Sequence, residues 1–485
     1  MDQLSQSVTL AVGYYDPFQV FSTILGEKFK KQTNLNSLYW KYKPADSIRT
    51  IKNVQLRYVE DDLANKVTNI NEEDVFMKFI FVTTTSVDEY RSKVRPIIRQ
   101  WLNNVKSMNP RVTYCIILYE NISLRSAADK FLKTSILTKI RNDFADPEMT
   151  LQNSFKIKSS YSDPDAEREI WNGLVSMIKF GIMESISAKM DYFHTLRPKL
   201  LGVRKSADLF LKIGQFVDSA EFYSRILQSV GNINKEDGFE RLDFQDLPLR
   251  SMISNVQSST YMTTKYEIKA YAYERLSQIL MNDSVKTIGL YMRNSLKLAD
   301  FLLSFLNSIY DCNKKSEFCI LLIEDFFSDK KLRFILDKNE EVPNQLYEVL
   351  GDLKFLEKDE LTNLGNSKNY KMKGCLSDIS FTSSSGEIMH PYKVISIKIE
   401  KFIKTEKLFK QHVVEITEEC IKLYSQSPYK QNTVDTLSTE VALMLYYSMN
   451  DYETSVEVIS NSFQFYKSSG WNSVSLALLK FTSSI

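Results

Sequence analysis

The chain has 485 residues, with 62 lysines and arginines against 60 aspartates and glutamates. This length exceeds what one compact hydrophobic core supports, so we expect at least two folding units or an extended array. The near balance of charge removes the broad positive field on which nonspecific phosphate binding depends, and it argues against nucleic acid as a partner.

Cysteine usage and hydropathy indicate a cytosolic protein. The cysteines are Cys115, Cys312, Cys319, Cys375 and Cys420. They are odd in number and form no CxxC pair, which argues against a disulfide framework and against a thiolate zinc site. The first ten residues lack the basic start and apolar run of a signal peptide, and the apolar patch at 298–306 is too short to span a bilayer.

The first two hundred residues show an alternation of strand and helix patterns. Strands are predicted, from their period-two or apolar runs, at residues 7–15, 53–60, 75–83, 112–120 and 154–158. The third and fourth of these are apolar on both faces, as strands buried between two helix layers must be. The pattern predicts an α/β domain over residues 1–198, with a mostly parallel sheet in a three-layer arrangement.

Residues 86–105 are predicted to form a helix that covers this sheet. Ser86 followed by Glu89 is a capping-box pattern. Apolar residues then recur at helical spacing, at Val87, Tyr90, Val94, Ile97, Ile98, Trp101 and Val105. Pro96 falls opposite that stripe, on the solvent side, where water can replace the lost backbone hydrogen bond and the helix can bend.

A basic edge follows one flank of the same helix. It consists of Arg91, Arg95 and Arg99, which step by four residues. Two interpretations remain open, a solvated helix flank and a dedicated site for an acidic partner. The near-zero net charge of the chain favours the solvated flank.

Two more helices complete the predicted domain. Residues 126–144 give one, whose buried face is Phe131, Leu132, Ile136, Leu137, Ile140 and Phe144. Another begins where Asp163 can cap it and Pro164 suits its first turn. This helix continues to about residue 198 through Ile170, Trp171, Leu174, Ile178 and Ile182.

The loop after the first predicted strand argues against nucleotide binding. A phosphate-binding loop needs several inward-facing backbone amides, and hence closely spaced glycines before a helix. Here the sequence is GYYDPF, residues 13–18, with one glycine, two bulky tyrosines and a proline that has no amide hydrogen. Neither GxxxxGK[ST] nor GxGxxG occurs in the chain.

Helical periods dominate from about residue 205 onward. Two helical hairpins are predicted, one around Gly214 and one around Asn450 and Asp451, and both are similar to tetratricopeptide hairpins. Further helices are predicted through Ile268, Ala272, Leu276 and Ile279, and through Ile288, Met292, Ala299, Leu302 and Leu306. We therefore expect an all-α solenoid of irregular hairpins over residues 199–485, interrupted by loops at 233–248 and 376–390.

No catalytic, cofactor or metal site is predicted. His194, His390 and His412 lie far apart without HExxH or paired cysteines, so we expect surface or capping histidines. The acidic clusters at 71–74 and 417–420 are interpreted as solvating charge. A noncatalytic scaffold or adaptor is the function that these observations favour.

Several ordered stretches resemble a known family. They are GYYDPFQVF, LNSLYWKYKPADSIRTI, DEYRSKVRPIIRQWL, SILTKIRNDF, EREIWNGL and MNDYETSVEVISNSFQFYKSSGWNSVSLALLK. In order and spacing they resemble the amino-terminal half of the large TRAPP II-specific subunits, the fungal 130-kilodalton class and its animal subunit-ten counterparts.

The resemblance implies a function. It implies a noncatalytic subunit of the TRAPP II tethering complex, which is a guanine-nucleotide exchange factor for late-Golgi Rab GTPases of the Ypt-thirty-one and Rab-eleven class. The implied partners are the small core subunits, the other TRAPP II-specific subunits, and the Rab GTPase and peripheral Golgi membrane through the complex. The implied location is cytoplasmic, peripheral at the late Golgi or trans-Golgi network.

The resemblance also implies a fold and leaves alternatives. Its amino-terminal domain is GTPase-like without a phosphate loop, and family members continue into carboxy-terminal β-sandwich domains, before which we expect this chain to be truncated. Two other functions remain open: a nucleotide-binding α/β protein with a divergent loop, and a helical-repeat adaptor unrelated to Rab proteins.

Overall fold

The computed structural model describes residues 8–43, 46–61, 75–108, 112–121, 135–144, 152–197, 199–229, 265–283, 287–309, 314–338, 342–374, 394 and 396–483. The chain divides into two compact units, Met1–Ser219 and Ala220–Ile485. The predicted division at residue 198 stays a prediction.

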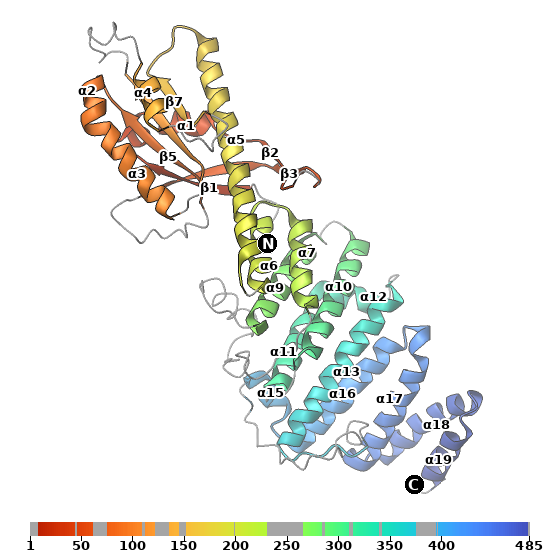
Figure 1. Ribbon diagram of the computed structural model, residues 1–485. Coiled ribbons are helices and arrows are strands. Elements are labelled where there is room, and N and C mark those ends of the chain that lie inside the picture. Colours follow the sequence, from red (N-terminus) through yellow and green to blue (C-terminus); the bar gives the residue numbers. More distant parts are fainter. Residues whose placement is uncertain are drawn as a thin grey trace. The chain divides into compact units, whose positions relative to one another are not determined.

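A five-stranded sheet forms the centre of the first unit (Figure 1). Its strands are β1 (Val8–Tyr15), β4 (Val54–Glu60), β5 (Val75–Thr83), β6 (Tyr114–Glu120) and β7 (Ser154–Lys158). They lie in the order β4-β1-β5-β6-β7, and all neighbouring pairs are parallel. The five predicted strands and the predicted parallel α/β arrangement are therefore confirmed.

Helices cover both faces of this sheet. On one face, α3 (Arg95–Met108) and α4 (Ile136–Asp143) bury Trp101 and Ile140 against Ile80 and Ile116 of the central strands. On the other face lie α1 (Gly26–Gln32) and α5 (Pro164–Thr195). There the ring of Phe29 lies 5.1–5.9 Å from the rings of Phe79, Phe81 and Trp171. The predicted three-layer fold is confirmed.

The helix after β5 begins as predicted and contains a wide turn. Its segments are α2 (Val87–Glu89), the π-helical segment η3 (Tyr90–Val94) and α3. The amide of Arg95 donates to the carbonyl of Tyr90, five residues back, just before the exposed Pro96. A proline ring clashes with the carbonyl four residues earlier, and a π turn relieves such crowding.

A two-stranded antiparallel hairpin was not predicted. It consists of β2 (Ser37–Trp40) and β3 (Arg49–Lys52), which form a sheet of their own. Each strand has only four residues, and strands that short carry little periodicity in the sequence. A second short π-helical segment, η1 (Phe21–Leu25), precedes α1.

Both predicted helical hairpins are present. The first joins α6 (Lys199–Lys212) to α7 (Phe216–Gln228) through Gly214, whose φ of 73° is in the left-handed region that glycine tolerates. The second joins α17 (Gln431–Met444) and η9 (Leu445–Met449) to α18 (Tyr452–Ser468). In that turn Asn450 is left-handed, and Asp451 caps α18 by accepting from the amide of Thr454.

The described part of the second unit is helical. Its further helices are α9 (Lys265–Asp283), α10 (Ile288–Asn307), α11 (Lys315–Phe327), α12 (Lys330–Lys338), α13 (Asn344–Ser367), α15 (Ile397–Phe402), α16 (Glu406–Tyr424), η8 (Pro428–Lys430) and α19 (Asn472–Ser483). They pack mainly on helices near them in the chain, as the predicted solenoid requires (Figure 1). The two predicted loops, at 233–248 and 376–390, lie outside the described residues.

Ion pairs join the helices α13, α16 and α17, and the pair between α13 and α17 is buried. The ammonium of Lys358 lies 3.0 Å from both carboxylate oxygens of Glu440, and both side chains are fully buried. Lys354 pairs with Glu357 at 2.9 Å and with Glu419 at 2.8 Å. Glu419 of the cluster 417–420 is paired across helices but stays largely exposed, so the interpretation of this cluster as solvating charge stays a prediction.

Candidate functional site at the carboxyl edge of the sheet

The carboxyl ends of the parallel strands form the candidate site. Open α/β sheets bind ligands at this edge, at the point where the connections from two neighbouring strands run to opposite sides. In this sheet β1 lies between β4 and β5, so the switch point adjoins the loops that follow β1 and β5. In nucleotide-binding proteins of this kind, helix amino termini at this edge supply amides for phosphate.

In the loop after β1, the carboxylate of Asp16 accepts hydrogen bonds from groups of the same loop. Oδ1 of Asp16 accepts a hydrogen bond from the amide of Val20 at 2.7 Å. Oδ2 accepts from the amide of Ser22 at 2.9 Å and from its hydroxyl at 3.0 Å. Asp16 is buried. The amides at the amino end of η1 that could donate to a phosphate therefore already donate to a carboxylate of the chain itself.

The loop after β5 repeats this arrangement. The carboxylate of Glu89 accepts from the amide of Thr85 at 2.8 Å and from the hydroxyls of Thr85 and Thr84 at 2.9 and 3.1 Å. The backbone hydrogen bond from Thr85 is the main reason that the pKa of Glu89 is lowered. Ser86 accepts from the amide of Glu89 at 3.2 Å, which confirms the predicted cap.

The first of the two tyrosines of GYYDPF, Tyr14, packs against an aromatic ring. The ring of Tyr14 lies 4.4 Å from the ring of Phe21, and burial is the main reason that the pKa of Tyr14 is raised. A Cβ at Gly13 would lie 2.9 Å from a carboxylate oxygen of Asp61, so a larger residue there would require that side chain to shift. That carboxylate forms an ion pair with Lys78 at 3.3 Å.

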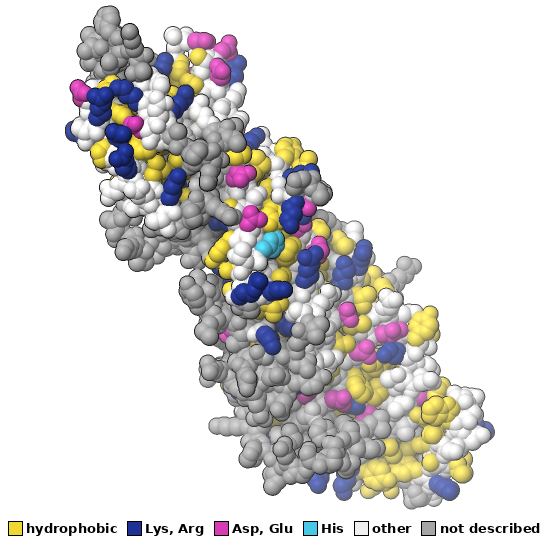
Figure 2. Space-filling model, in the orientation of Figure 1, with side chains coloured by type: hydrophobic (Ala, Val, Ile, Leu, Met, Phe, Trp, Pro, Cys, Tyr) yellow, Lys and Arg dark blue, Asp and Glu magenta, His cyan; other side chains and the backbone are white. Residues whose placement is uncertain are grey.

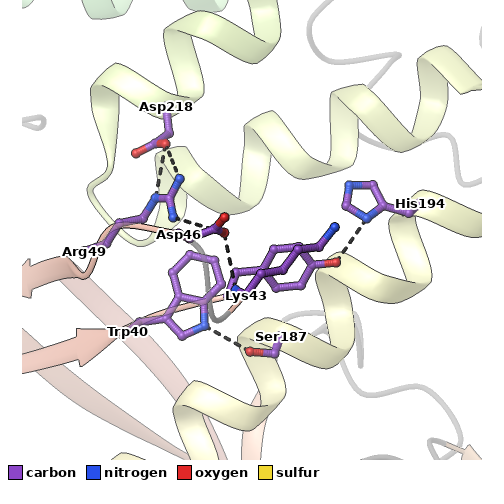
Figure 3. A network of polar contacts seen from close by, with 8 residues as sticks. Trp40, Lys43, Asp46, Arg49, Ser187, His194 and Asp218 are labelled. Carbon is purple, nitrogen blue, oxygen red and sulfur yellow. Dashed lines mark hydrogen bonds and ion pairs between the residues drawn. The ribbon is translucent and has the colours of Figure 1, made fainter.

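The hairpin that sequence reasoning missed is fixed to α5, α6 and α7 by a polar network (Figure 3). The indole of Trp40 donates to the hydroxyl of Ser187 at 3.0 Å. Arg49 donates twice to Oδ1 of Asp218, at 3.1 and 2.8 Å, and its guanidinium lies 5.5 Å from the rings of Trp40 and Phe210. The alternation of Leu38 and Trp40 in SLYW was the available signal.

The basic edge lies where it was predicted and is used in part by the chain itself. Figure 2 shows dark blue side chains gathered over α2 and α3. Arg95 forms an ion pair with Asp143 of α4 at 3.0 Å, and Arg91 lies 4.0 Å from Asp88. Arg99 is exposed. These pairs fit the solvated flank, and an acidic partner of this edge stays a prediction.

The histidines and cysteines are not brought together. His194 is exposed and lies 3.1 Å from the hydroxyl of Tyr42, whereas the ring of His412 stacks on Phe402 at 4.2 Å. Three cysteines are buried free thiols, Cys115, Cys319 and Cys420. His390, Cys312 and Cys375 lie outside the described residues.

The residues that the structure describes contain neither a metal-binding cluster nor a membrane-spanning helix. No group of three or more histidine, cysteine, aspartate or glutamate residues could hold a metal ion there. No helix in this part of the chain is both long enough and apolar enough to cross a bilayer.

The fold and its carboxyl edge define a class of protein: a parallel α/β domain without a glycine-rich phosphate-loop motif after its first strand, followed by helical hairpins. Two family models match the same two regions. The model for "Trafficking protein particle complex subunit 10-like, N-terminal" matches residues 5–196, and the model for "TR130 NTS domain" matches residues 296–485. The chain belongs to the family of the large TRAPP II-specific subunits.

Individual relatives agree with this assignment. "Trafficking protein particle complex II-specific subunit 130" of Saccharomyces cerevisiae is 25% identical over an alignment of 507 residues, which covers 99% of this chain and 43% of the yeast protein. "Trafficking protein particle complex subunit 10" of Homo sapiens and that of Mus musculus are each 23% identical over 196 residues, 36% of this chain and 15% of theirs. The chain thus spans less than half the length of these relatives.

Proposed function

We propose that the chain is a noncatalytic scaffold and specificity subunit of the TRAPP II tethering complex. In this proposal the complex is a guanine-nucleotide exchange factor for late-Golgi Rab GTPases of the Ypt-thirty-one and Rab-eleven class. The chain binds the small core subunits and the other TRAPP II-specific subunits, and it meets the Rab GTPase and the peripheral membrane of the late Golgi or trans-Golgi network through them. Its domains are an α/β domain at 1–198 and a solenoid at 199–485.

The main support for a noncatalytic role is the position of Asp16. Its buried carboxylate accepts from the amides of Val20 and Ser22, at the place where a GTPase-like fold would bind phosphate. A bound phosphate would bring further negative charge against a buried carboxylate, which is unfavourable without a compensating cation. This supports a domain that acts through its surfaces.

Reconstitution tests the assembly and specificity parts. We expect the purified chain to co-elute with the small core subunits in size-exclusion chromatography. We also expect the full-length subunit, added to the core, to shift nucleotide exchange toward the late-Golgi Rab class over an early-Golgi Rab. Failure to join the core, together with unchanged Rab preference, would overturn the proposal.

Calorimetry separates this proposal from the nucleotide-binding alternative. Titration of GTP and of ATP into the chain, with Mg²⁺ present, is expected to give no binding heat. A dissociation constant in the micromolar range would correspond to about −8 kcal/mol and would contradict the role given to Asp16. The Asp16→Ala variant is the matched comparison, because it removes the competing carboxylate.

A further inference from the structure

Four lysines lie where α15 meets the start of α16 in the second unit. Lys398, Lys401, Lys404 and Lys407 recur every third residue along this stretch, and all four are exposed. We call this surface, together with the adjacent Ile397 and Leu408, the lysine corner.

Buried anchors on the opposite side hold the corner in place. Ile399, Ile403 and Phe409 are fully buried. Thr405 caps α16 by accepting from the amide of Leu408 at 3.3 Å. Since the inward residues are packed and the turn is capped, the lysines face solvent from α15, from the turn and from the first residues of α16.

Positive charge exceeds negative charge at the corner, although Lys398 interacts electrostatically with the part-buried Glu324 of α11. Residues 397–410 contain five lysines and two glutamates, Glu400 and Glu406. The fifth lysine, Lys410, pairs with Glu406 at 2.7 Å. The four lysines of the corner form no ion pair with the described residues. The local excess of positive charge therefore faces outward.

Two exposed aliphatic side chains are neighbours of these lysines in the chain. Ile397 is 73% exposed and Leu408 is 44% exposed, and each is next to a lysine in the chain. Exposed aliphatic groups within a cationic surface suit the interfacial layer of an anionic bilayer, where both can be satisfied at once. Protein interfaces are depleted in lysine and enriched in arginine, which favours a membrane over an acidic protein here.

We infer that the lysine corner is a direct membrane-contact surface, which binds anionic phospholipid headgroups through its lysines and places Ile397 and Leu408 among them. This contact is additional to the membrane attachment that the other subunits provide in the proposed function, and it needs no other subunit. It can therefore fail while the proposed assembly holds, and it can hold while the assembly fails.

Vesicle co-sedimentation of the whole chain tests this inference. We expect binding to phosphatidylcholine vesicles that contain phosphatidylserine, weak binding to phosphatidylcholine alone, and a decrease as salt is added. Each lysine near an anionic surface increases the membrane-partition coefficient about fivefold. The partition coefficient of the Lys401→Glu, Lys407→Glu double variant should therefore fall about 30-fold or more.

A control variant with the same charge change separates the corner from net charge. Lys422 at the far end of α16 and Lys480 of α19 are both exposed, so Lys422→Glu with Lys480→Glu should lose far less binding. Ile397→Ser with Leu408→Ser should weaken binding and preserve its salt dependence. Equal losses in the corner and control variants, or equal binding to both kinds of vesicle, would overturn the inference. Unchanged vesicle binding in the corner variant would also overturn it.

Discussion

Replacing Asp16 with alanine should destabilise the first unit strongly. The change removes three hydrogen bonds to a buried carboxylate, from the amides of Val20 and Ser22 and from the hydroxyl of Ser22. A lost helix cap costs about 0.5–2 kcal/mol, and buried donors without partners add about 1–3 kcal/mol. Water reaching one amide would offset part of this, so we expect about 2–4 kcal/mol in the free energy of unfolding.

Urea unfolding followed by tryptophan fluorescence measures this loss. Three of the four tryptophans lie in the first unit, namely Trp40, Trp101 and Trp171. The matched control is Asp163→Ala, because Asp163 caps α5 through one exposed hydrogen bond, at 2.9 Å, and should cost about 1 kcal/mol. Equal losses in the two variants, or a loss below about 1 kcal/mol for Asp16→Ala, would refute the role assigned to this carboxylate.

Three further predictions concern the second unit and use urea unfolding followed by circular dichroism. Lys358→Met should cost about 3–5 kcal/mol because it removes the buried cation that lies 3.0 Å from the buried Glu440 carboxylate, whereas adding Glu440→Leu should recover most of the loss; equal losses would contradict the pairing. Gly351→Ala should cost about 1–3 kcal/mol because its Cβ would lie 2.4 Å from a buried tyrosine ring of α16, whereas Gly289→Ala, with open space around it, should be neutral or stabilising. Burial raises the pKa of Glu357 to about 7 in the folded protein. Between about pH 4.5 and pH 7 the folded state therefore keeps a proton that the unfolded state releases. The free energy of unfolding of the wild type should fall, relative to that of Glu357→Gln, as pH rises through this range. A pH-independent difference between these two proteins would contradict that assignment.

Local patterns predicted the elements of the first unit well. The apolar run that became β5 is long and is interrupted by one charged residue, Lys78. The caps at Ser86 and Asp163 depend on side chains within three residues of the amides that they accept from. Periodicity and capping are properties of neighbouring residues, so they can be read without knowledge of the fold. The π turn before Pro96 was missed because it is a compromise between helix geometry and a proline ring.

The sequence predicted only in part that the loop at the carboxyl edge of the sheet is unsuited to phosphate. The shortage of glycine in GYYDPF argued against a phosphate loop, but nothing in the sequence showed that Asp16 itself would accept from Val20 and Ser22. An aspartate before a proline is also an ordinary turn residue. Its role here depends on the three-dimensional path of the backbone after β1.

The sequence by itself determined the parallel α/β domain, the helical array after it and the lack of recognisable phosphate-binding or metal-binding motifs. These follow from periodicity, composition and spacing, which act over a few residues. Only the tertiary structure decided that Trp40 and Arg49 of the β2–β3 hairpin meet Ser187 and Asp218, and that Lys358 is buried against its partner on α17. Contacts between residues 82 to 169 positions apart depend on how whole elements pack, and no local pattern encodes that packing.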